Sequence, residues 1–531
     1  MYVQTFDPLG NLGWSALLAA LPLLTLFVLL GIVRAKAQWA GLAALGVSLV
    51  IAVAAYHMPI GQAFSAAGYG AAFSFLNVLW IVANALWIFK LTEASGHFMV
   101  LRRSFASISP DLRVQTLLVA FAFGALLEAL AGAGTPVAIS ALMLISLGMK
   151  PMRAAIAALV ANTAPVAFGA LAVPVVTLAK VTSLDFEELG AIIGRQTSLV
   201  AAFVPLVLVF IVDGRHGLKQ TWAHALVAGI AFGLGQFVSS NYVSVELADI
   251  VSALCCALAL VVMQRVRPIR QPFVAETDSG DEAKQDSRGQ VFLAYAPYLI
   301  VIAMFVVVQI PAIKSALNRT AITFAWPGLS YSSPSGKLAN TAFTFNFVPS
   351  TGTLLLVAGV LTAALLRITA VDAARIWGST VHQLRWTIVT VLAVLALAFV
   401  MNYSGQTGTL GTSLAQLGSL FAFVSPIIGW IGVAITGSDN SANALFGAVQ
   451  TTAAQQTGLS PELMAAANSS GGVVGKMLSP QSLAIAAAVV GLAGREGDIF
   501  RKVLGYSLGL LLVLCVLVYL QSTPVLSWML P

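Results

Sequence analysis

The sequence predicts an all-α polytopic membrane protein with about 12–16 transmembrane or re-entrant helices in two inverted structural repeats with broken helices. Three observations lead to this fold class. Hydrophobic residues make up 59% of the 531 residues, charged residues only 9%, and the mean hydropathy is +0.92. Soluble domains carry roughly a quarter charged residues. The apolar residues form helix-length runs, and motifs that break these runs occur twice.

The apolar runs set the expected helices, because a helix needs about 20 apolar residues to cross a bilayer. The segment before the first run lacks the basic residues and cleavage site of a signal peptide, so we expect a retained helix. Hydropathy does not separate re-entrant hairpins from full spans within 114–149 and 417–494. The runs lie at 14–33, 38–57, 69–89, 114–131, 135–149, 154–179, 191–212, 221–238, 248–264, 292–312, 350–367, 385–402, 417–436, 440–455, 461–494 and 503–522.

The net charge of +7 comes from Lys and Arg in short loops between the runs. This is the pattern of cytoplasmic loops rather than of a nucleic-acid partner. The polar segments 184–189, 239–249 and 401–409 then lie on the other side, which places both termini outside. The hydrophilic stretch 271–290 reads as a flexible cytoplasmic linker, and 311–349 as an external loop.

An internal duplication relates the two halves. Asn162 and Asn468, Gly169 and Gly475, and Pro174 and Pro480 are each 306 positions apart; so are Arg195 and Arg501, while Gly132 and Gly437 are 305 apart. The charge pattern starts the two copies from opposite sides of the membrane, as in secondary transporters. We therefore expect a first repeat at 1–220, joining helices and the linker at 221–290, and a second repeat at 291–531.

Two carboxylates, Glu128 and Asp439, lie inside the repeated apolar motifs. An ionised carboxylate in a bilayer is costly, so it faces a cavity, pairs with a cation or holds a proton. Glu128 precedes the glycine break at Gly132 by four residues; the alternative is a carboxylate that packs helices together. Asp439 has the alternative of capping a helix over 441–450.

Lys476 stands in the second of the later motifs, GGVVGKMLSP. A buried ammonium there attracts a substrate carboxylate or pairs with Asp439 or Glu128; the alternative is a lysine that reaches the membrane surface. Small polar residues at the same breaks suit a small anion with a hydroxyl, or else bridge the broken helices. They are Gly132, Gly134, Thr135, Asn162, Thr163, Ser438, Asn440, Asn443, Asn468, Ser469 and Ser470.

No pattern points to an enzyme. The cysteines Cys255, Cys256 and Cys515 lie in apolar runs, and the five histidines show no ligand spacing, so neither a disulfide framework nor a metal site is indicated. No nucleophile–base arrangement is visible, and no cofactor is expected.

At these motifs the chain resembles bacterial L-lactate permeases from end to end. In one place it departs from them: their first break usually reads Glu-Gly-x-x-Gly-Phe-Gly-x-Pro, and here Ala129 and Ala133 replace the first Gly and the Phe. This departure leaves the exact substrate open. The shared motifs are Tyr2–Pro22, Ile108–Gln115, Asn162–Ala170, Met401–Gly405, Ile435–Phe446, Ala453–Gly458, Ser470–Ala486 and Ser527–Pro531.

The resemblance implies a secondary active transporter that imports L-lactate, glycolate and D-lactate with protons across the bacterial inner membrane. Glu128 or Asp439 is then expected to carry the proton, and Lys476 with the small polar residues to bind the substrate. The partners implied are the carboxylate, protons and lipid. A sodium-coupled carboxylate transporter and an anion channel remain open alternatives, as does assembly into a homo-oligomer.

Overall fold

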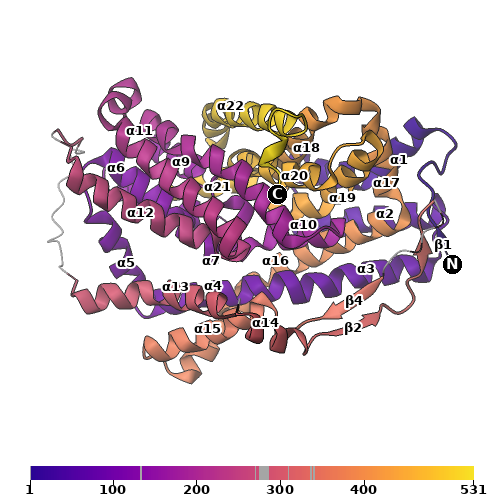
Figure 1. Ribbon diagram of the computed structural model, residues 1–531, viewed down its shortest axis with the longest axis horizontal. Helices are drawn as coiled ribbons and strands as arrows, with labels where there is room; N and C mark the ends of the chain where they lie inside the picture. Colours follow the sequence, from indigo (N-terminus) through magenta and orange to yellow (C-terminus); the bar gives the residue numbers. More distant parts are fainter. Residues whose placement is uncertain are drawn as a thin grey trace.

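Helices make up nearly all of the structure, and many of the longest lie side by side (Figure 1). The computed structural model describes residues 2–131, 134–269, 271–273, 286–308, 310–334, 336, 338 and 341–531. Within these residues, 11 helices are long and apolar enough to cross a membrane, or 12 if a bent pair counts as one span. Shorter apolar helices lie at Thr135–Ser146 and Thr351–Leu365. The chain is an all-α polytopic membrane protein, as predicted.

The first helices run from the N-terminal α1 to α5. Asn11 caps the first one by accepting a hydrogen bond from the Trp14 amide, which satisfies one of the free N–H groups at a helix start. The group consists of α1 (Leu12–Phe27) with η1 (Val28–Ile32), α2 (Ala37–Ala54), α3 (Ile60–Ser74), η2 (Phe75–Leu79), α4 (Trp80–Ala94) and α5 (His97–Ala106).

The next helices contain the first set of breaks. The chain bends by 59° between α9 and α10, where the sequence suggested a single run over 154–179. Pro165 falls in this gap and cannot donate a helical hydrogen bond. The elements are α6 (Leu112–Thr116), η3 (Leu117–Phe123), α7 (Gly124–Ala131), α8 (Thr135–Ser146), α9 (Pro151–Ala161), η4 (Val166–Phe168), α10 (Gly169–Thr182) and α11 (Phe186–Val238).

The middle of the chain joins the halves. Helix α13 begins inside the predicted linker 271–290, because Arg288–Val308 is helical; residues 274–285 of that linker lie outside the described part. The predicted loop 311–349 contains a short helix and an antiparallel strand pair. The elements are η5 (Ser239–Val243), η6 (Val245–Leu247), α12 (Ala248–Val266), α13 (Arg288–Val308), α14 (Pro311–Asn318), β2 (Ile322–Ala325), β3 (Tyr331–Ser332), which pairs with β1 (Tyr2–Val3), and β4 (Ala342–Phe345).

The last helices repeat the order of breaks seen in the first half. A helix, a short break, a second helix, a third helix, a 3₁₀ turn and a fourth helix precede a long helix in each half. The elements are α15 (Thr351–Leu365), α16 (Ala370–Ser404), α17 (Gln406–Leu414), η7 (Ala415–Leu420), α18 (Phe421–Thr436), α19 (Asp439–Thr457), α20 (Pro461–Gly475), η8 (Lys476–Leu478), α21 (Pro480–Val489), α22 (Glu496–Gln521) and η9 (Ser527–Met529).

The two sets of broken helices pack against each other in a reciprocal way. Helix α10 packs on α19, and α21 packs on α8. Helix α9 contacts both α11 and α22, and α20 contacts the same two helices. These exchanged contacts fit the predicted duplication, while the opposite direction of the copies and the domain limits stay predictions.

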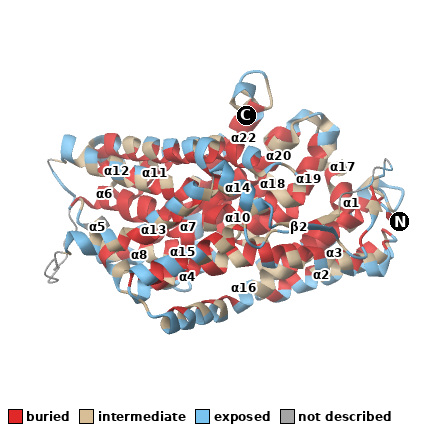
Figure 2. Ribbon diagram, turned by 60° about the horizontal axis from the view of Figure 1, so that its bottom comes forward, coloured by how far each residue is buried: buried red, intermediate tan, exposed pale blue. Residues whose placement is uncertain are grey.

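The broken helices form the inside of the protein. The segment Leu112–Leu130 is buried along its whole length, whereas Leu12–Ile32 and Arg288–Val308 keep most residues at the surface. Figure 2 shows the buried residues running through the middle of the helix assembly. The outer helices therefore separate the breaks from lipid, which is where broken backbone is tolerated in a membrane protein.

Candidate substrate-binding cavity

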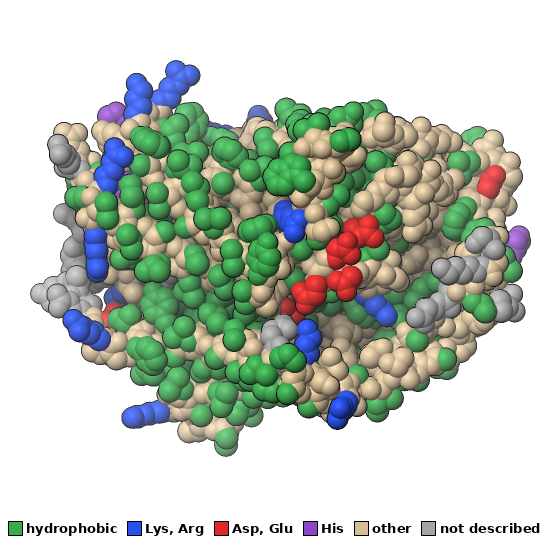
Figure 3. Space-filling view, viewed as in Figure 1, with side chains coloured by type: hydrophobic (Ala, Val, Ile, Leu, Met, Phe, Trp, Pro, Cys, Tyr) green, Lys and Arg blue, Asp and Glu red, His purple; other side chains and the backbone are tan. Residues whose placement is uncertain are grey.

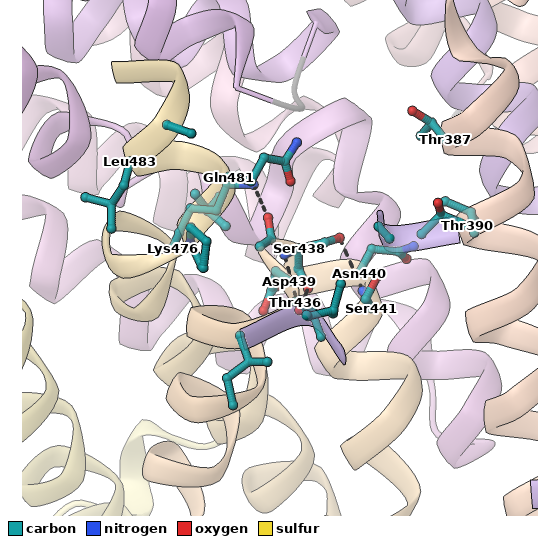
Figure 4. A pocket seen from close by; sticks show the side chains of 18 of the residues that line it. Thr387, Thr390, Thr436, Ser438, Asp439, Asn440, Ser441, Lys476, Gln481 and Leu483 are labelled. Atoms are coloured by element: carbon teal, nitrogen blue, oxygen red, sulfur yellow. Dashed lines mark hydrogen bonds between the residues drawn. The ribbon is translucent and has the colours of Figure 1, made fainter. Parts of the chain in front are cut away.

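A cavity of about 1040 Å³ lies between the two sets of breaks. Its rim carries surface residues, among them Arg34, Trp386 and Gly497. Its inner part carries three buried charged residues, Glu128, Asp439 and Lys476. Figure 4 shows Asp439 and Lys476 on neighbouring segments of the wall, with Ser438 beside Asp439. The structure thus brings charged residues more than 300 positions apart to one cavity.

Glu128 lies in α7, just before the first break, and is 4% exposed. Its Oε2 accepts a hydrogen bond of 2.9 Å from Nδ2 of Asn162 at the end of α9. A Cβ at Gly169 would stand 3.0 Å from Oε1 of Glu128, so the absence of a side chain at position 169 leaves room for the carboxylate. Both partners belong to the break between α9 and α10.

The backbone after Gly169 has an unusual conformation. Ala170, Leu171 and Ala172 have φ angles of 46°, 54° and 59°. Left-handed backbone costs roughly 1–2 kcal/mol for each residue with a side chain. Such conformations persist where the surroundings impose them, and they gather at functional sites. Gly169 and Ala170 line the cavity, so this irregular backbone forms part of its wall.

Asp439 is the first residue of α19 and is 2% exposed. Its Oδ2 accepts hydrogen bonds from Ser469 Oγ at 2.6 Å and from Asn443 Nδ2 at 3.4 Å. The cap of this helix is Ser438, whose hydroxyl accepts from the Ser441 amide. The capping role considered for Asp439 is therefore wrong, since the helix starts two residues earlier than 441.

The other carboxylate oxygen of Asp439, Oδ1, is buried and accepts no hydrogen bond from the described residues. A Cβ at Gly472 would stand 2.3 Å from it. A buried carboxylate oxygen without a partner is costly, so this atom is able to hold a proton.

Lys476 does not reach the membrane surface: it is 7% exposed and lines the cavity. Its Nζ donates a hydrogen bond of 2.8 Å to the Gly437 carbonyl at the end of α18. The described residues show no ion pair of Lys476 with Glu128 or Asp439 within 4.0 Å, but its charge acts on Asp439. The ammonium thus retains donors for an anion at the start of α19.

Several predicted residues connect the helices behind the cavity wall. Asn443 Nδ2 donates to the Pro174 carbonyl at 3.1 Å, and Asn468 Nδ2 donates to Asn443 Oδ1 at 2.9 Å. Thr177 bonds Asn440, which also lines the cavity. Thr163 donates to the Val160 carbonyl at 2.7 Å. The bonds of Asn443, Asn468 and Asn440 tie α10, α19 and α20 together, which is the bridging alternative considered from the sequence, whereas the bond of Thr163 stays within the end of α9.

The remaining predicted residues that the structure describes do not line the cavity, and Ser470 lies within α20 instead of at a break. Gly134 has a φ of 90° and precedes α8, which begins at Thr135. The Ser470 hydroxyl is buried and has no partner among the described residues. Gly132 lies outside the described residues. Of the predicted set, the cavity wall includes Glu128, Ser438, Asp439, Asn440 and Lys476, and direct substrate contact by the others stays a prediction.

One buried carboxylate was missed by sequence reasoning. Asp249 lies in the first turn of α12 and is completely buried. It was assigned to an external polar segment because SSNYVSVELAD precedes the apolar run. The apolar residues that follow it directly were the available signal. Gln481, at the start of α21, also lines the cavity and had not been selected.

A cavity with buried charged residues between broken helices, inside a bundle of membrane-spanning length, defines a membrane transporter of the polytopic class. The family model described as L-lactate permease matches residues 15–525. The chain belongs to the L-lactate permease family, and it is a multi-pass protein of the bacterial inner membrane.

Named relatives match over nearly their full length. An L-lactate permease of Bacillus subtilis (strain 168) is 40% identical, with 100% of both chains covered. The glycolate permease GlcA of Escherichia coli (strain K12) is 40% identical, with 98% of both covered. An L-lactate permease of the same strain is 39% identical, with 100% of both covered. Among solved structures, the Alcanivorax borkumensis YdaH transporter is 16% identical, covers 85% of this chain and 86% of its own, and has a TM-score of 0.47.

Proposed function

We propose that the protein imports L-lactate and related small 2-hydroxymonocarboxylates, glycolate and D-lactate, by proton symport, without changing them chemically. The observation that carries this proposal is the cavity that holds Glu128, Asp439 and Lys476 together. The names of the relatives support the substrate class, since they include both lactate and glycolate permeases.

The substrate carboxylate is bound at the start of α19. Free N–H groups at a helix N-terminus attract anions, and Ser438, Asp439, Asn440 and Ser441 of this turn line the cavity. The Lys476 ammonium supplies a positive charge beside the same turn. The hydroxyl of the substrate is bound by the neutral side chains of the wall, including Gln481 and Thr436.

Glu128 or Asp439 carries the coupling proton. The empty carrier with an ionised carboxylate takes up one proton and one substrate monoanion, which together carry no net charge. The loaded carrier therefore has the same charge as the empty one. This avoids a cost of roughly 2.3 kcal/mol per charge per 100 mV of membrane potential. The unpartnered Oδ1 of Asp439 and the cavity-facing position of Glu128 leave both groups open to a proton.

We infer that this arrangement of the helices is an inward-facing form. The rim of the cavity includes Arg34 and Glu496, and the Lys and Arg pattern assigns these loops to the cytoplasm. Substrate and proton are therefore released through this rim after they have entered from the other side.

The test is uptake of labelled L-lactate into proteoliposomes, with and without an imposed pH gradient and with sodium or potassium as the only cation. We expect accumulation that needs the pH gradient and not sodium. Sodium-driven, pH-independent accumulation contradicts proton coupling, and uptake that never exceeds equilibrium indicates a channel. Unlabelled glycolate and D-lactate serve as competitors to define the substrate class.

A further inference from the structure

A second cavity, of about 530 Å³, lies where α9 and α22 begin, and its wall is basic. The two helices come from different halves of the chain and contact each other. One carboxylate shares this wall with four cations, which leaves the described lining with a net charge of +3 at neutral pH. We call this cavity the basic pocket. Its charged residues are Lys150, Arg495, Asp498, Arg501 and Lys502.

Asp498 holds two of these cations in place. Its Oδ2 accepts a hydrogen bond of 2.9 Å from Arg495 Nε, and its Oδ1 accepts one of 2.9 Å from Arg501 Nη2. A guanidinium has several N–H donors, so both arginines keep donors that the carboxylate does not use. Lys150 and Lys502 form no ion pair with the described residues. The pocket therefore keeps an excess of positive charge, and guanidinium and ammonium groups bind phosphate oxygens well.

Apolar surface adjoins the cations of the basic pocket. Pro151 and Leu492 belong to its wall. Leu508 and Leu512 lie on the same side of α22 as Arg501, because seven residues make about two helical turns and four make about one. Both leucines are exposed, by 46% and 57%, and Figure 3 shows hydrophobic side chains over much of the visible face. An acyl chain attached to a bound phosphate can therefore lie along α22.

The position of the basic pocket suits a lipid headgroup. The Lys and Arg pattern assigns both Lys150 and the segment 495–502 to the cytoplasmic side of the membrane. Basic pockets between membrane helices on this side bind anionic headgroups. A phospholipid such as phosphatidylglycerol carries a phosphate and acyl chains in one molecule, whereas inorganic phosphate offers only the charge. The combination of cations and apolar surface therefore favours the lipid.

The start of α22 separates the basic pocket from the substrate cavity. Phe500 lines the substrate cavity, and Arg501, the next residue, lines the basic pocket. Glu496 and Arg495 divide between the two cavities in the same way. On the other wall of the pocket, α9 runs from its start there to the break at Asn162. A ligand in the basic pocket therefore contacts two helices that also shape the substrate cavity.

We propose that the basic pocket binds the headgroup phosphate of an anionic phospholipid from the cytoplasmic leaflet. The phosphate bridges Lys150 at the start of α9 and Arg501 in α22, and it holds the two helices together beside the rim of the substrate cavity. Binding does not depend on which substrate the protein transports or on how transport is coupled. Because the lipid stays outside the substrate cavity, it raises the stability of the protein and the maximal rate of uptake and leaves the KM for L-lactate unchanged.

The first test measures lipid binding. Purified full-length protein in a neutral detergent is titrated with phosphatidylglycerol, and native mass spectrometry gives the fraction of protein with bound lipid. The double variant Lys150→Gln with Arg501→Gln removes one cation from each wall, so its apparent affinity should fall at least about tenfold, since each cation near an anionic lipid contributes to binding. The double variant Arg215→Gln with Lys219→Gln removes two exposed cations of α11 assigned to the same side. It is the control and should bind like the wild type.

Two other ligands decide what the basic pocket recognises. Phosphatidylcholine has no net charge and should bind the wild type at least about tenfold more weakly than phosphatidylglycerol. Inorganic phosphate, added at constant ionic strength, should not displace phosphatidylglycerol, because it lacks the acyl chains. Equal binding of phosphatidylcholine, or displacement by inorganic phosphate, overturns the proposal. Unchanged binding of phosphatidylglycerol by the pocket variant overturns it as well.

Thermal unfolding and uptake test what the bound lipid does. Without lipid, the pocket variant should unfold at the wild-type temperature, because exposed charges contribute little to stability. Phosphatidylglycerol should then raise the unfolding temperature of the wild type but not of the pocket variant. In phosphatidylcholine proteoliposomes, added phosphatidylglycerol should raise the maximal rate of the wild type alone.

The outcomes separate this inference from the proposed function. If the wild type binds phosphatidylglycerol through the pocket but transports no L-lactate, the proposed function fails and lipid binding stands. If the wild type accumulates L-lactate and the pocket variant responds to phosphatidylglycerol as the wild type does, only the inference fails.

Discussion

Asn162 Nδ2 lies 2.9 Å from Glu128 Oε2, so a residue at the end of α9 donates a hydrogen bond to the carboxylate in the last turn of α7. The amide oxygen of Asn162 has no partner among the described residues. The bond therefore positions Glu128 from one side and leaves the cavity side free. A group that must gain and lose a proton during transport needs this combination of a fixed position and open access.

Glu128→Gln is expected to uncouple transport. The amide keeps the size of the side chain and can still accept a bond from Asn162, but it cannot carry a proton. Accumulation against a gradient should fall at least about tenfold, while lactate exchange continues. Labelled uptake and exchange in proteoliposomes measure the two activities. Glu496→Gln, which removes a carboxylate from the rim of the same cavity, is the matched control and should keep its coupling.

Asp439 gives a second prediction through neighbouring serines of α20. Ser469 Oγ donates a hydrogen bond of 2.6 Å to Asp439 Oδ2, whereas the buried Ser470 hydroxyl has no hydrogen-bond partner among the described residues. Ser469→Ala should destabilise the protein by about 1.5–3 kcal/mol, the range for a hydrogen bond to a charged group, and it should lower the uptake rate. Ser470→Ala should change both much less. Thermal unfolding in detergent and uptake by each variant are the measurements, and equal effects would contradict the role given to Ser469.

These serines show where sequence reasoning stops. The motif NSSGG predicted Asn468, Ser469 and Ser470 at a helix break, but the structure buries all three inside α20, which continues to Gly475. Their different partners follow from how α20 is rotated against α19, and a single sequence does not contain that rotation. The same holds for Lys476, which bonds a backbone carbonyl that any residue at 437 would supply.

The fold class and the two breaks were predictable for a physical reason. Lipid excludes charge and broken backbone, so Glu128, Pro136 and Pro165 inside apolar runs had to mark a protected interior. Asp249 was missed because it lies at the first turn of a span, next to a polar segment. Its burial comes from packing of α12 on α7 and α11, which are far away in sequence.

Gly472 tests how closely α20 approaches Asp439. An added Cβ would lie 2.3 Å from Asp439 Oδ1 and 2.7 Å from Val433 Cγ2, which requires the Asp439 carboxylate and the Val433 side chain to shift. Gly472→Ala should therefore abolish pH-driven uptake. Gly505→Ala in α22 is the control, since nothing lies within 4 Å of its Cβ; alanine is also the better helix former by roughly 1 kcal/mol. Normal uptake by Gly472→Ala would contradict the packing of α20 against the start of α19.

Lys476 is expected to affect substrate affinity more than turnover. Lys476→Gln removes the positive charge beside the start of α19, so the KM for L-lactate should rise about tenfold or more, in line with 1.5–3 kcal/mol for hydrogen bonds to charged groups. The surface residue Lys502 is the control, and Lys502→Gln should leave the KM unchanged. Initial uptake rates over a range of lactate concentrations give KM and maximal rate separately. A lower maximal rate at constant KM would place Lys476 in the conformational change instead.

Arg113 should be among the most costly residues to replace outside the cavity. It is 1% exposed, and its guanidinium lies 2.6 Å from Asp111 Oδ2 and 3.1 Å from Asp213 Oδ2. It also donates to the Gln271 carbonyl at 3.3 Å, which fastens the start of the linker to α6 and α11. Removing one partner of a buried ion pair costs about 3–5 kcal/mol, because the remaining charges stay buried without compensation.

Arg113→Met should therefore lower the unfolding temperature strongly, and the double variant Arg113→Met with Asp111→Asn should recover part of the loss. The comparison is Arg375→Met, which breaks an exposed pair with Asp372 at 2.8 Å; exposed pairs contribute little because water screens them. Thermal unfolding of all three variants in one detergent measures the difference. If Arg113→Met and Arg375→Met unfold at the same temperature, water reaches the Arg113 cluster and its burial does not determine its cost.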